Sequence, residues 1–375
     1  MRLLVFNPDH DLALAAATPH YTAPPNAVVF ANDFATLPAW LHDEGEVVSA
    51  LPMVDAYQRL GGVCSVVPCL QRYDSVEPWG WNAAIRQRLL HRGLDAALLP
   101  SDELLDHWRL LSHRRTAMQL AEFLQEPIKA EELTTMEAVE RFVMRYPETV
   151  LKAPWSGSGR GLMGGAGTVT PQIKSRCQKL LATQGCVMGE RRLRVVQDFA
   201  MEFWRNDEGK ASFRGYSVFN TRNGVYTQSL LGTTKTLEEQ LTRYVPKHRL
   251  EALQQACCIF ISERLTDYVG NVGIDMFVYA NEAGCFEVNP AVEVNLRNTM
   301  GNVALELSTR WLSPDAIGTF TIDFSPTPGA LLADHLQRAT EKPLTLHEGK
   351  IVKGYLSLCP VTEQTHFRAR LEVGF

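Results

Sequence analysis

Hydrophobic positions in the first 110 residues form short apolar runs, and stretches with helical spacing such as 81–91 lie between some of them. Strands that alternate with helices are typical of a largely parallel sheet. We therefore expect an N-terminal α/β lobe over residues 1–110. The predicted strands are 3–6, 27–31, 47–51, 63–67 and 96–99.

Polar residues follow the first predicted strand directly, in the segment Asn7-Pro8-Asp9-His10-Asp11. Ligands of open α/β sheets collect at the carboxyl ends of the strands. Asn7, Asp9 and His10 are therefore candidates for contact with a substrate. A turn or capping role for Asn-Pro-Asp is the alternative.

Beyond residue 110 the pattern changes to longer helices and paired strands. We expect a small lobe over 111–190, a large lobe over 191–315 and a C-terminal extension over 316–375. The predicted helices are 101–124 (in two parts), 131–146, 170–183, 249–267 and 329–340, and the predicted strands are 149–154, 194–204, 212–220, 225–230, 273–279, 284–290, 319–324 and 350–358.

A lysine lies inside the strand 149–154, and a segment rich in glycine and serine follows it. The segment contains G-x-G-x-x-G at 159–164, but the dinucleotide fingerprint needs a helix to start at its glycines, and 164–169 is not helical in pattern. The flanking extended segments instead predict a loop between antiparallel strands, whose N–H groups fold over an anion. Lys152 would reach the same phosphate as a point charge. A glycine-rich hairpin turn is the alternative. The loop candidates are Ser156, Gly157, Ser158, Gly159, Arg160 and Gly161.

The segment 194–204 resembles a buried strand and places Glu202 between Met201 and Phe203. Its main chain offers hydrogen bonds to a base, and Glu202 is a candidate acceptor for ribose hydroxyls. An ion pair between Glu202 and a nearby arginine is the alternative.

The most informative pair of strands is 273–279 and 284–290, joined by a turn over 280–284 that contains glycine. With that turn, Asp275 faces Asn289 and Phe277 faces Glu287, so Asp275, Glu287 and Asn289 share one face of the hairpin. Two carboxylates and an amide are oxygen donors that suit Mg²⁺ or Mn²⁺. A solvated face is the alternative.

Glu-Val-Asn occurs a second time, at 293–295, followed by Leu296 and Arg297. The predicted pairing favours the first copy, because Pro290 is expected to end the ladder before the second. Glu293, Asn295 and Arg297 would then lie just beyond the metal. Arg297 suits a phosphate or a carboxylate, because guanidinium is a planar bidentate donor. Structural support of the loop is the alternative for Glu293 and Asn295.

Composition narrows the class of protein. The chain of 375 residues has 45% hydrophobic and 21% charged residues and a net charge of −5, with no basic run, so no nucleic-acid partner is expected. Eight cysteines show no C-x-x-C pair and no zinc spacing, as in a reduced protein. The chain begins with a predicted strand rather than a signal peptide, and no apolar run reaches the roughly 18–20 residues of a membrane span. We expect a cytoplasmic protein with no membrane partner.

Over about 110–305, the order and spacing of these blocks resemble the ATP-grasp superfamily. The motifs are 150–154 with 157–161, 196–199 with Glu202, and 273–275 with 286–290. The resemblance implies an N-terminal pre-ATP-grasp-like parallel α/β lobe, followed by a two-lobed ATP-grasp fold with antiparallel sheets, in sum an α/β and α+β protein.

The resemblance also implies roles for single residues. Lys152 would bind phosphate, and 157–161 would close over the triphosphate. Phe199 and Ala200 would lie at the adenine hinge, with Gln197 where many relatives carry Glu, and Glu202 on the ribose. An earlier basic residue would contact the nucleotide, for which Arg115 is favoured and Arg114 stays open. The implied magnesium ligands are Asp275, Glu287 and Asn289.

The activity implied by the resemblance is that of an ATP- and Mg²⁺-dependent ligase, which activates a carboxylate as an acyl phosphate for attack by an amine. Lys152 and Arg297 would be its catalytic cations, because such chemistry needs positioned charge rather than a covalent nucleophile. The substrates would be small-molecule or peptide carboxylates and amines, and a homodimer stays open. A phosphotransferase and a non-catalytic nucleotide-binding module are the alternatives.

Overall fold

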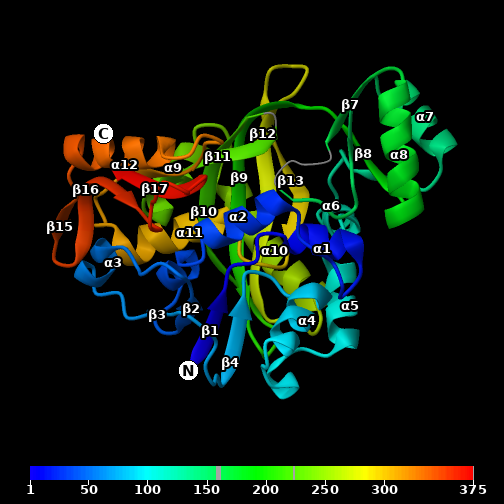
Figure 1. Cartoon of the computed structure of the whole chain (residues 1–375). Coiled ribbons are helices and arrows are strands. Elements are labelled where there is room, and N and C mark those ends of the chain that lie inside the picture. Colours follow the sequence, from blue (N-terminus) through cyan, green and yellow to red (C-terminus); the bar gives the residue numbers. More distant parts are fainter. Residues whose placement is uncertain (158–161, 223, 375) are drawn as a thin grey trace.

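The N-terminal lobe holds a four-stranded parallel sheet in the order β3-β2-β1-β4 (Figure 1). The structure is a computed structural model, and it describes residues 1–157, 162–222 and 224–374. The predicted parallel α/β lobe is confirmed. The sheet's strands are β1 (Arg2–Val5), β2 (Glu46–Val48), β3 (Ser65–Val67) and β4 (Ser75–Pro78).

Two predicted strands of this lobe are wrong. Residues 27–31 lie in helix α2 (Pro25–Asp33), because Pro25 at the first helical turn has the fixed φ that a helix start needs. Residues 96–98 form a short 3₁₀ helix, η2, whose first turn is capped by the Asp95 carboxylate. Strand β4 was missed because it is short and carries Glu77 and Pro78 rather than an apolar run. The other helices of the lobe are α1 (His10–Ala16), η1 (Leu37–Leu41), α3 (Asp55–Arg59), α4 (Ala83–His91) and α5 (Asp102–Leu111).

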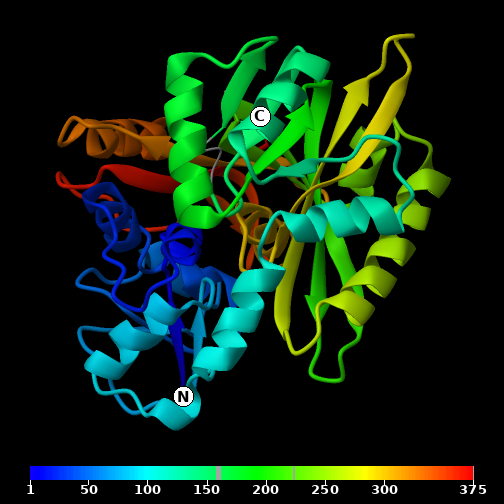
Figure 2. The same cartoon turned by 90° about the vertical axis from the view of Figure 1, so that its right-hand side faces the viewer.

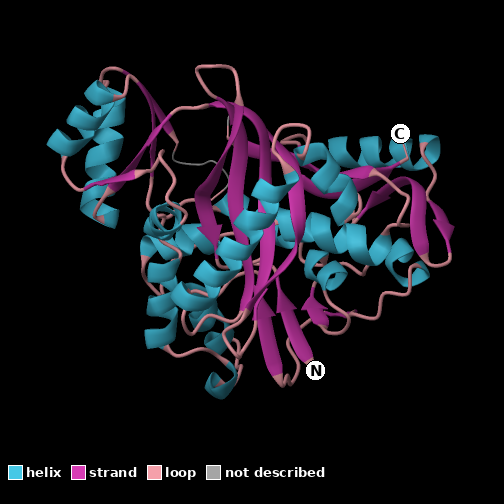
Figure 3. Cartoon of the chain, turned by 180° about the vertical axis from the view of Figure 1, so that it is seen from behind, coloured by secondary structure: helices cyan, strands magenta, loops and turns pink. Residues whose placement is uncertain are grey.

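The small lobe is an antiparallel sheet in the order β5-β8-β6-β7, which projects from the rest of the molecule with helices α7 and α8 (Figure 1 and Figure 3). The segment 131–146 begins as a strand, not a helix, because the Thr135 hydroxyl caps α7 and fixes its start. Its elements are α6 (Arg115–Phe123), β5 (Glu131–Leu133), α7 (Met136–Arg145), β6 (Glu148–Lys152), β7 (Met163–Ala166), α8 (Pro171–Gln184) and β8 (Val187–Arg191).

The large sheet is antiparallel and has nine strands in the order β13-β12-β9-β10-β11-β14-β17-β16-β15. The C-terminal strands continue this sheet, so a boundary at 315/316 runs through one continuous layer. The strands are β9 (Arg194–Arg205), β10 (Ala211–Arg222), β11 (Val225–Leu231), β12 (Gly270–Ala280), β13 (Phe286–Asn295), β14 (Gly318–Phe324), β15 (Thr345–His347), β16 (Lys350–Ser357) and β17 (Phe367–Val373).

One face of strands β9, β10 and β12 packs on helix α10 (Lys247–Arg264), which lies along the sheet (Figure 2). The buried side chains of this contact include Phe199, Met276 and Val278. The opposite face of these strands carries Glu202 and Asp275. A second core joins the N-terminal lobe to the C-terminal strands, with Trp40 against Trp311 and near Ile351. The remaining helices are α9 (Thr234–Leu241), α11 (Met300–Glu306), the π-helix η3 (Leu307–Trp311) and α12 (Ala330–Glu341).

Among the helices over 1–157, 162–222 and 224–374, none is long and apolar enough to cross a membrane.

Candidate functional site

The predicted pairing of the hairpin β12/β13 is wrong by two residues. Tyr279 faces Glu287 and Phe277 faces Asn289, because the Asn281 carboxamide oxygen accepts from the N–H groups of Ala283 and Cys285 and sets a turn over 281–285. A shift of two residues keeps every side chain on its predicted face but moves it along the strand. Glu287 and Asn289 therefore do not lie opposite Asp275.

Strand β13 also does not end at Pro290. The register shifts between Asp275 and Phe277, and beyond this irregularity Asp275 faces Glu293 and Gly273 faces Asn295. Proline lacks a ladder N–H, and a bulge lets the strand absorb it. The second Glu-Val-Asn copy is consequently the one that meets Asp275.

The cluster of Asp275, Glu293 and Asn295 is partly buried and acidic. The Asn295 amide donates to Asp275 Oδ2 at 3.3 Å. Burial, with the nearby Glu293 carboxylate, raises the pKa of Asp275 to about 7. Two carboxylates held this close are destabilising without a neighbouring cation, so the cluster is suited to bind one.

The polar side chains of the first Glu-Val-Asn copy make local contacts among the described residues. Glu287 is exposed near the hairpin tip, where its carboxylate accepts from the Tyr279 hydroxyl and from Asn281 Nδ2. The Asn289 side chain accepts from the Ala291 N–H at 3.3 Å, beside the bulge. The cross-strand pairing on which the predicted metal role of Glu287 and Asn289 rested is absent.

Arg114, the open alternative at the nucleotide, points into the site, while Arg115 points away. Arg114 is 8% exposed, donates to the Ala153 carbonyl at 3.1 Å, and forms an ion pair with Glu293 at 3.0 Å. Arg115 is about half exposed and pairs with Glu132. Both arginines start α6, and successive residues of a helix face different directions.

Lys152 ends strand β6, where its ammonium lies 2.6 Å from Glu190 on the neighbouring strand β8. The side chain is buried. The next residues, Trp155 and Ser156, line a narrow pocket together with Glu293, Asn295 and Arg297. The loop candidates Ser158, Gly159, Arg160 and Gly161 lie outside the described residues. The antiparallel pairing of β6 with β7 confirms the predicted strands on both sides of the loop.

Arg297 makes a contact that the sequence did not indicate. Its Nε and Nη2 groups donate to the two carboxylate oxygens of Asp11 at 3.0 and 2.9 Å. Burial alone would lower the pKa of Arg297, but Asp11 and the nearby acidic cluster keep the pKa above its usual range. Asp11 belongs to the N-terminal lobe, so this pair joins that lobe to the segment after strand β13 at the pocket.

The other polar residues after β1 are engaged within their own lobe. The Asn7 amide donates to the Gly80 carbonyl at 2.8 Å, and buried Asp9 pairs with Arg88 at 3.2 Å. The His10 ring accepts from Asn82 Nδ2 at 3.1 Å, and burial lowers the pKa of His10 to about 4. His10 lines the narrow pocket beside Asp11, whereas Asn7 and Asp9 shape the turn.

Glu202 lies on the same face as the acidic cluster, opposite Gly273, but is only 2% exposed. Its carboxylate accepts from the Thr299 hydroxyl at 2.9 Å, and burial raises the pKa of Glu202 to about 8. A Cβ atom on Gly301 would lie 2.1 Å from Glu202 Oε1, so glycine is required there. The alternative prediction was an ion pair between Glu202 and an arginine. The structure instead has a hydrogen bond from the Thr299 hydroxyl to the Glu202 carboxylate.

Several solved structures have a similar fold and align with the whole length of this chain. They include N5-carboxyaminoimidazole synthetase from Staphylococcus aureus complexed with ADP, at TM-score 0.52 and 12% identity over 93% of that chain. They also include a biotin carboxylase complex from Campylobacter jejuni, at TM-score 0.52 and 12% identity over 87% of that chain. The biotin carboxylase domain dimer of the 2-oxoglutarate carboxylase from Hydrogenobacter thermophilus, in complex with MgADP, ADP and bicarbonate, has TM-score 0.54 and 10% identity over 86% of that chain. The chain has the ATP-grasp fold. No family model matches the sequence, and no curated protein matches it significantly.

The predicted adenine-hinge residues divide between the two faces of the large sheet. Ala200 faces Asp275 across the strands and shares the face of the acidic cluster. Phe199 and Gln197 point to the other face, where Phe199 is buried in the core. Gln197 lines a cavity of about 170 Å³ on that face, together with Gln228, Gln240 and Tyr244. The structure therefore does not bring Gln197 and Phe199 together with the acidic cluster.

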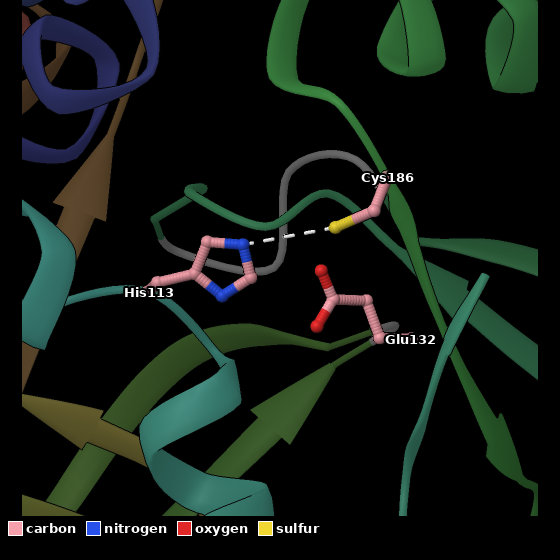
Figure 4. Close-up of side chains that lie close together, drawn as sticks. All are labelled: His113, Glu132 and Cys186. Atoms are coloured by element: carbon pink, nitrogen blue, oxygen red, sulfur yellow. Dashed lines mark hydrogen bonds between the residues drawn. The ribbon is translucent and has the colours of Figure 1, made fainter. Parts of the chain in front are cut away.

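A second group of possible metal ligands lies in the ATP-grasp small lobe, where His113, Glu132 and Cys186 point toward one another (Figure 4). Their hydrogen bonds already form a chain without a metal. The Arg115 N–H donates to His113 Nδ1 at 2.9 Å, which leaves the proton on Nε2, 3.7 Å from Cys186 Sγ. Burial, and a hydrogen bond to Glu132, raise the pKa of the Cys186 thiol. Because the His113 ring also packs edge-on against Trp155, the group supports the start of the glycine-rich loop.

Proposed function

We propose that this protein is an ATP- and Mg²⁺-dependent ligase that activates a carboxylate as an acyl phosphate for attack by an amine. The observation that carries the proposal is the pairing of Asp275 with Glu293 and Asn295 on one face of the hairpin, where Glu293 and Asn295 line a narrow pocket together with Arg297. A carboxylate pair for a divalent cation and an arginine for phosphoryl oxygens are what phosphoryl transfer requires.

Asp275, Glu293 and Asn295 are the residues that would hold Mg²⁺. Their fit is supported by the raised pKa of Asp275, which burial and the neighbouring Glu293 produce and which a cation would reverse. Oxygen donors of this kind, few in number, leave room for phosphate oxygens and water. Magnesium would supply charge neutralisation at the phosphates.

The nucleotide phosphates would lie between the small lobe and the face of the large sheet that carries Asp275 and Glu202. Lys152 and Arg114 are buried cations beside the start of the loop, and both are paired with carboxylates of the chain, Glu190 and Glu293. Anionic phosphates would compete for these cations, while Mg²⁺ takes Glu293. Ser156 and Gly157 belong to this region, and the roles of 158–161 rest on the resemblance.

In the first proposed step, an oxygen of the substrate carboxylate attacks the γ-phosphorus of ATP, the bond to the β,γ-bridging oxygen breaks, and ADP leaves. In the second, the amine nitrogen attacks the acyl carbon, loses a proton, and inorganic phosphate leaves. Arg297 would stabilise the oxygens of the transferring group, because its donors lie at the cluster. His10 lines the same pocket and would face the carboxylate or the amine.

Support for ligation rather than another use of ATP comes from the fold and from the neighbours, which include a synthetase complexed with ADP and a carboxylase domain with MgADP and bicarbonate. We also propose that the protein can form a homodimer, because that carboxylase domain is described as a dimer.

We further propose that the protein is cytoplasmic, since its eight cysteines are free thiols, as in a reducing compartment.

The test is to incubate the protein with ATP, Mg²⁺ and pools of carboxylates and amines. Release of ADP and phosphate only when both pools are present supports the ligase. A phosphorylated acceptor would instead identify a phosphotransferase. Nucleotide binding without turnover against broad pools would identify a non-catalytic module.

A further inference from the structure

The segment 7–11 after strand β1 carries two acidic residues, and of these Asp11 forms its ion pair outside the N-terminal lobe. Asp9 pairs with Arg88 inside the lobe, whereas both Asp11 oxygens accept from Arg297, which lies 286 residues further along the chain. The pair is mostly shielded from water, with side chains 14% and 21% exposed. A bidentate arginine–carboxylate pair of this kind fixes geometry as well as charge.

The segment that carries Asp11 is itself held in place. The Asn7 side chain clamps Gly80 through its amide and its carbonyl, and the His10 ring packs where a Cβ on Gly80 would lie 2.6 Å from Nδ1. Asp11 therefore projects from an anchored turn. Because the backbone that carries Asp11 is fixed, we expect the Asp11 carboxylate to orient the Arg297 side chain.

Arg297 keeps capacity for a ligand in this pose. A guanidinium carries five N–H donors. Among the described residues, Asp11 takes two of them and the Asn298 carbonyl takes one at 3.1 Å, which leaves two. Since Arg297 lines the pocket with Glu293 and Asn295, the free donors are available to phosphoryl oxygens there.

Asp11 also meets the glycine-rich loop. A Cβ atom on Gly157 would lie 2.2 Å from Asp11 Oδ2, so the loop backbone lies directly on the carboxylate. The same carboxylate thus touches the arginine and the first residue of the loop.

We propose that Asp11 is a positioning residue for Arg297: the N-terminal lobe orients the arginine toward the transferring phosphoryl group, and thereby takes part in phosphoryl transfer. This inference rests on the proposed function. It predicts that Asp11 controls the rate of the chemical step and not the affinity for ATP, because a carboxylate does not attract an anionic nucleotide.

The experiment measures ADP release from ATP and Mg²⁺, with the acceptor pools, for the full chain and for Asp11→Asn and Asp11→Ala. We expect kcat to fall about tenfold to a hundredfold, while KM for ATP stays within about twofold or falls. Sodium formate should restore part of the rate of Asp11→Ala, because formate can replace the missing carboxylate on Arg297. Glu126→Gln is the matched control, since Glu126 also pairs with an arginine, Arg249, but outside this pocket.

Unchanged kcat in both Asp11 variants, or a rise in KM for ATP of the same size as the fall in kcat, would overturn the inference. Absence of formate rescue when Asp11→Ala is folded and slow would count against it as well. If the wild type neither binds nor turns over ATP, the proposed function fails instead.

In that case a double-mutant cycle of Asp11→Asn and Arg297→Gln, measured by chemical unfolding, decides whether the two side chains are coupled. Additive changes in the free energy of unfolding would overturn the inference.

Discussion

Glu293→Gln and Glu287→Gln remove one negative charge from each of the two Glu-Val-Asn copies and differ by little else. The structure places Glu293 opposite Asp275 and leaves Glu287 exposed near the hairpin tip. Only Glu293→Gln should therefore abolish metal-dependent turnover. The pair of variants separates the two copies in one assay, because each is the control for the other.

The size of the effect on folding follows from two opposing contacts. Glu293→Gln removes the 3.0 Å ion pair with Arg114, which is 8% exposed and keeps its bonds to Ala153 and Ser156. Loss of such a partner alone would cost about 1–2 kcal/mol, below the value for a fully isolated buried charge. The substitution also removes the repulsion with Asp275. We expect the free energy of unfolding to change by less than about 1 kcal/mol.

The effect on activity should be much larger. An amide keeps an oxygen but loses the charge that would neutralise Mg²⁺, and loss of one group that stabilises the transition state typically costs about a hundredfold or more, roughly 3 kcal/mol. Glu287→Gln keeps one acceptor oxygen, for either the Tyr279 hydroxyl or Asn281 Nδ2, at an exposed position, and should change stability by less than about 1 kcal/mol and leave the rate within about twofold.

The assay is ADP release as a function of Mg²⁺ concentration, with unfolding by urea measured on the same samples. A Glu293→Gln protein that is as active as the wild type would refute the assignment of the second copy to the metal. A large loss of activity in Glu287→Gln with unchanged stability would show that the first copy, as the sequence alone predicts, is used.

Further predictions concern the nucleotide, the pH and the packing of the site. Lys152→Ala should weaken ATP binding by about tenfold or more and, because it leaves Glu190 without its 2.6 Å ion pair, should also lower the free energy of unfolding; an unchanged dissociation constant in calorimetry would contradict its role. Because burial raises the pKa of Glu202 from 4.5 to about 8, the folded state holds a proton that the unfolded state releases, so the contribution of this group to stability should be complete below pH 4.5 and be lost as the pH rises to about 8. Glu202→Gln should flatten that fall in a series of urea titrations, and a slope equal to that of the wild type would argue against a buried neutral acid. Gly301→Ala places a Cβ 2.1 Å from Glu202 Oε1 and should cost about 1–3 kcal/mol, which a wild-type urea midpoint would disprove.

Much of the fold was predictable because its signals are local. The strand that contains Lys152, the glycine-rich segment after it and the helix after residue 170 depend on neighbouring residues, and the structure has them as β6, β7 and α8. The strand predicted at 27–31 was wrong because a second local signal was overlooked. Its apolar run suits a strand, but a proline at the first turn starts a helix there.

The candidate site was predictable only in part, since its residues come from distant segments. The face of the hairpin follows from the alternation of side chains, and Asp275 and Glu287 do share a face. Which glutamate lies beside Asp275 depends on a turn set by Asn281 and on a bulge at Pro290. Neither has a strong sequence signal.

The sequence by itself determined the kinds of groups that the proposed phosphate site uses: a lysine on a strand, a glycine-rich segment after it, and acidic residues on a two-stranded hairpin. The tertiary structure alone decided their partners. It brought Glu293 rather than Glu287 to Asp275, turned Arg114 inward, and joined Asp11 to Arg297. The physical reason is that side-chain chemistry and local periodicity are written in adjacent residues, whereas strand register and contacts between lobes are set by the packing of the whole chain.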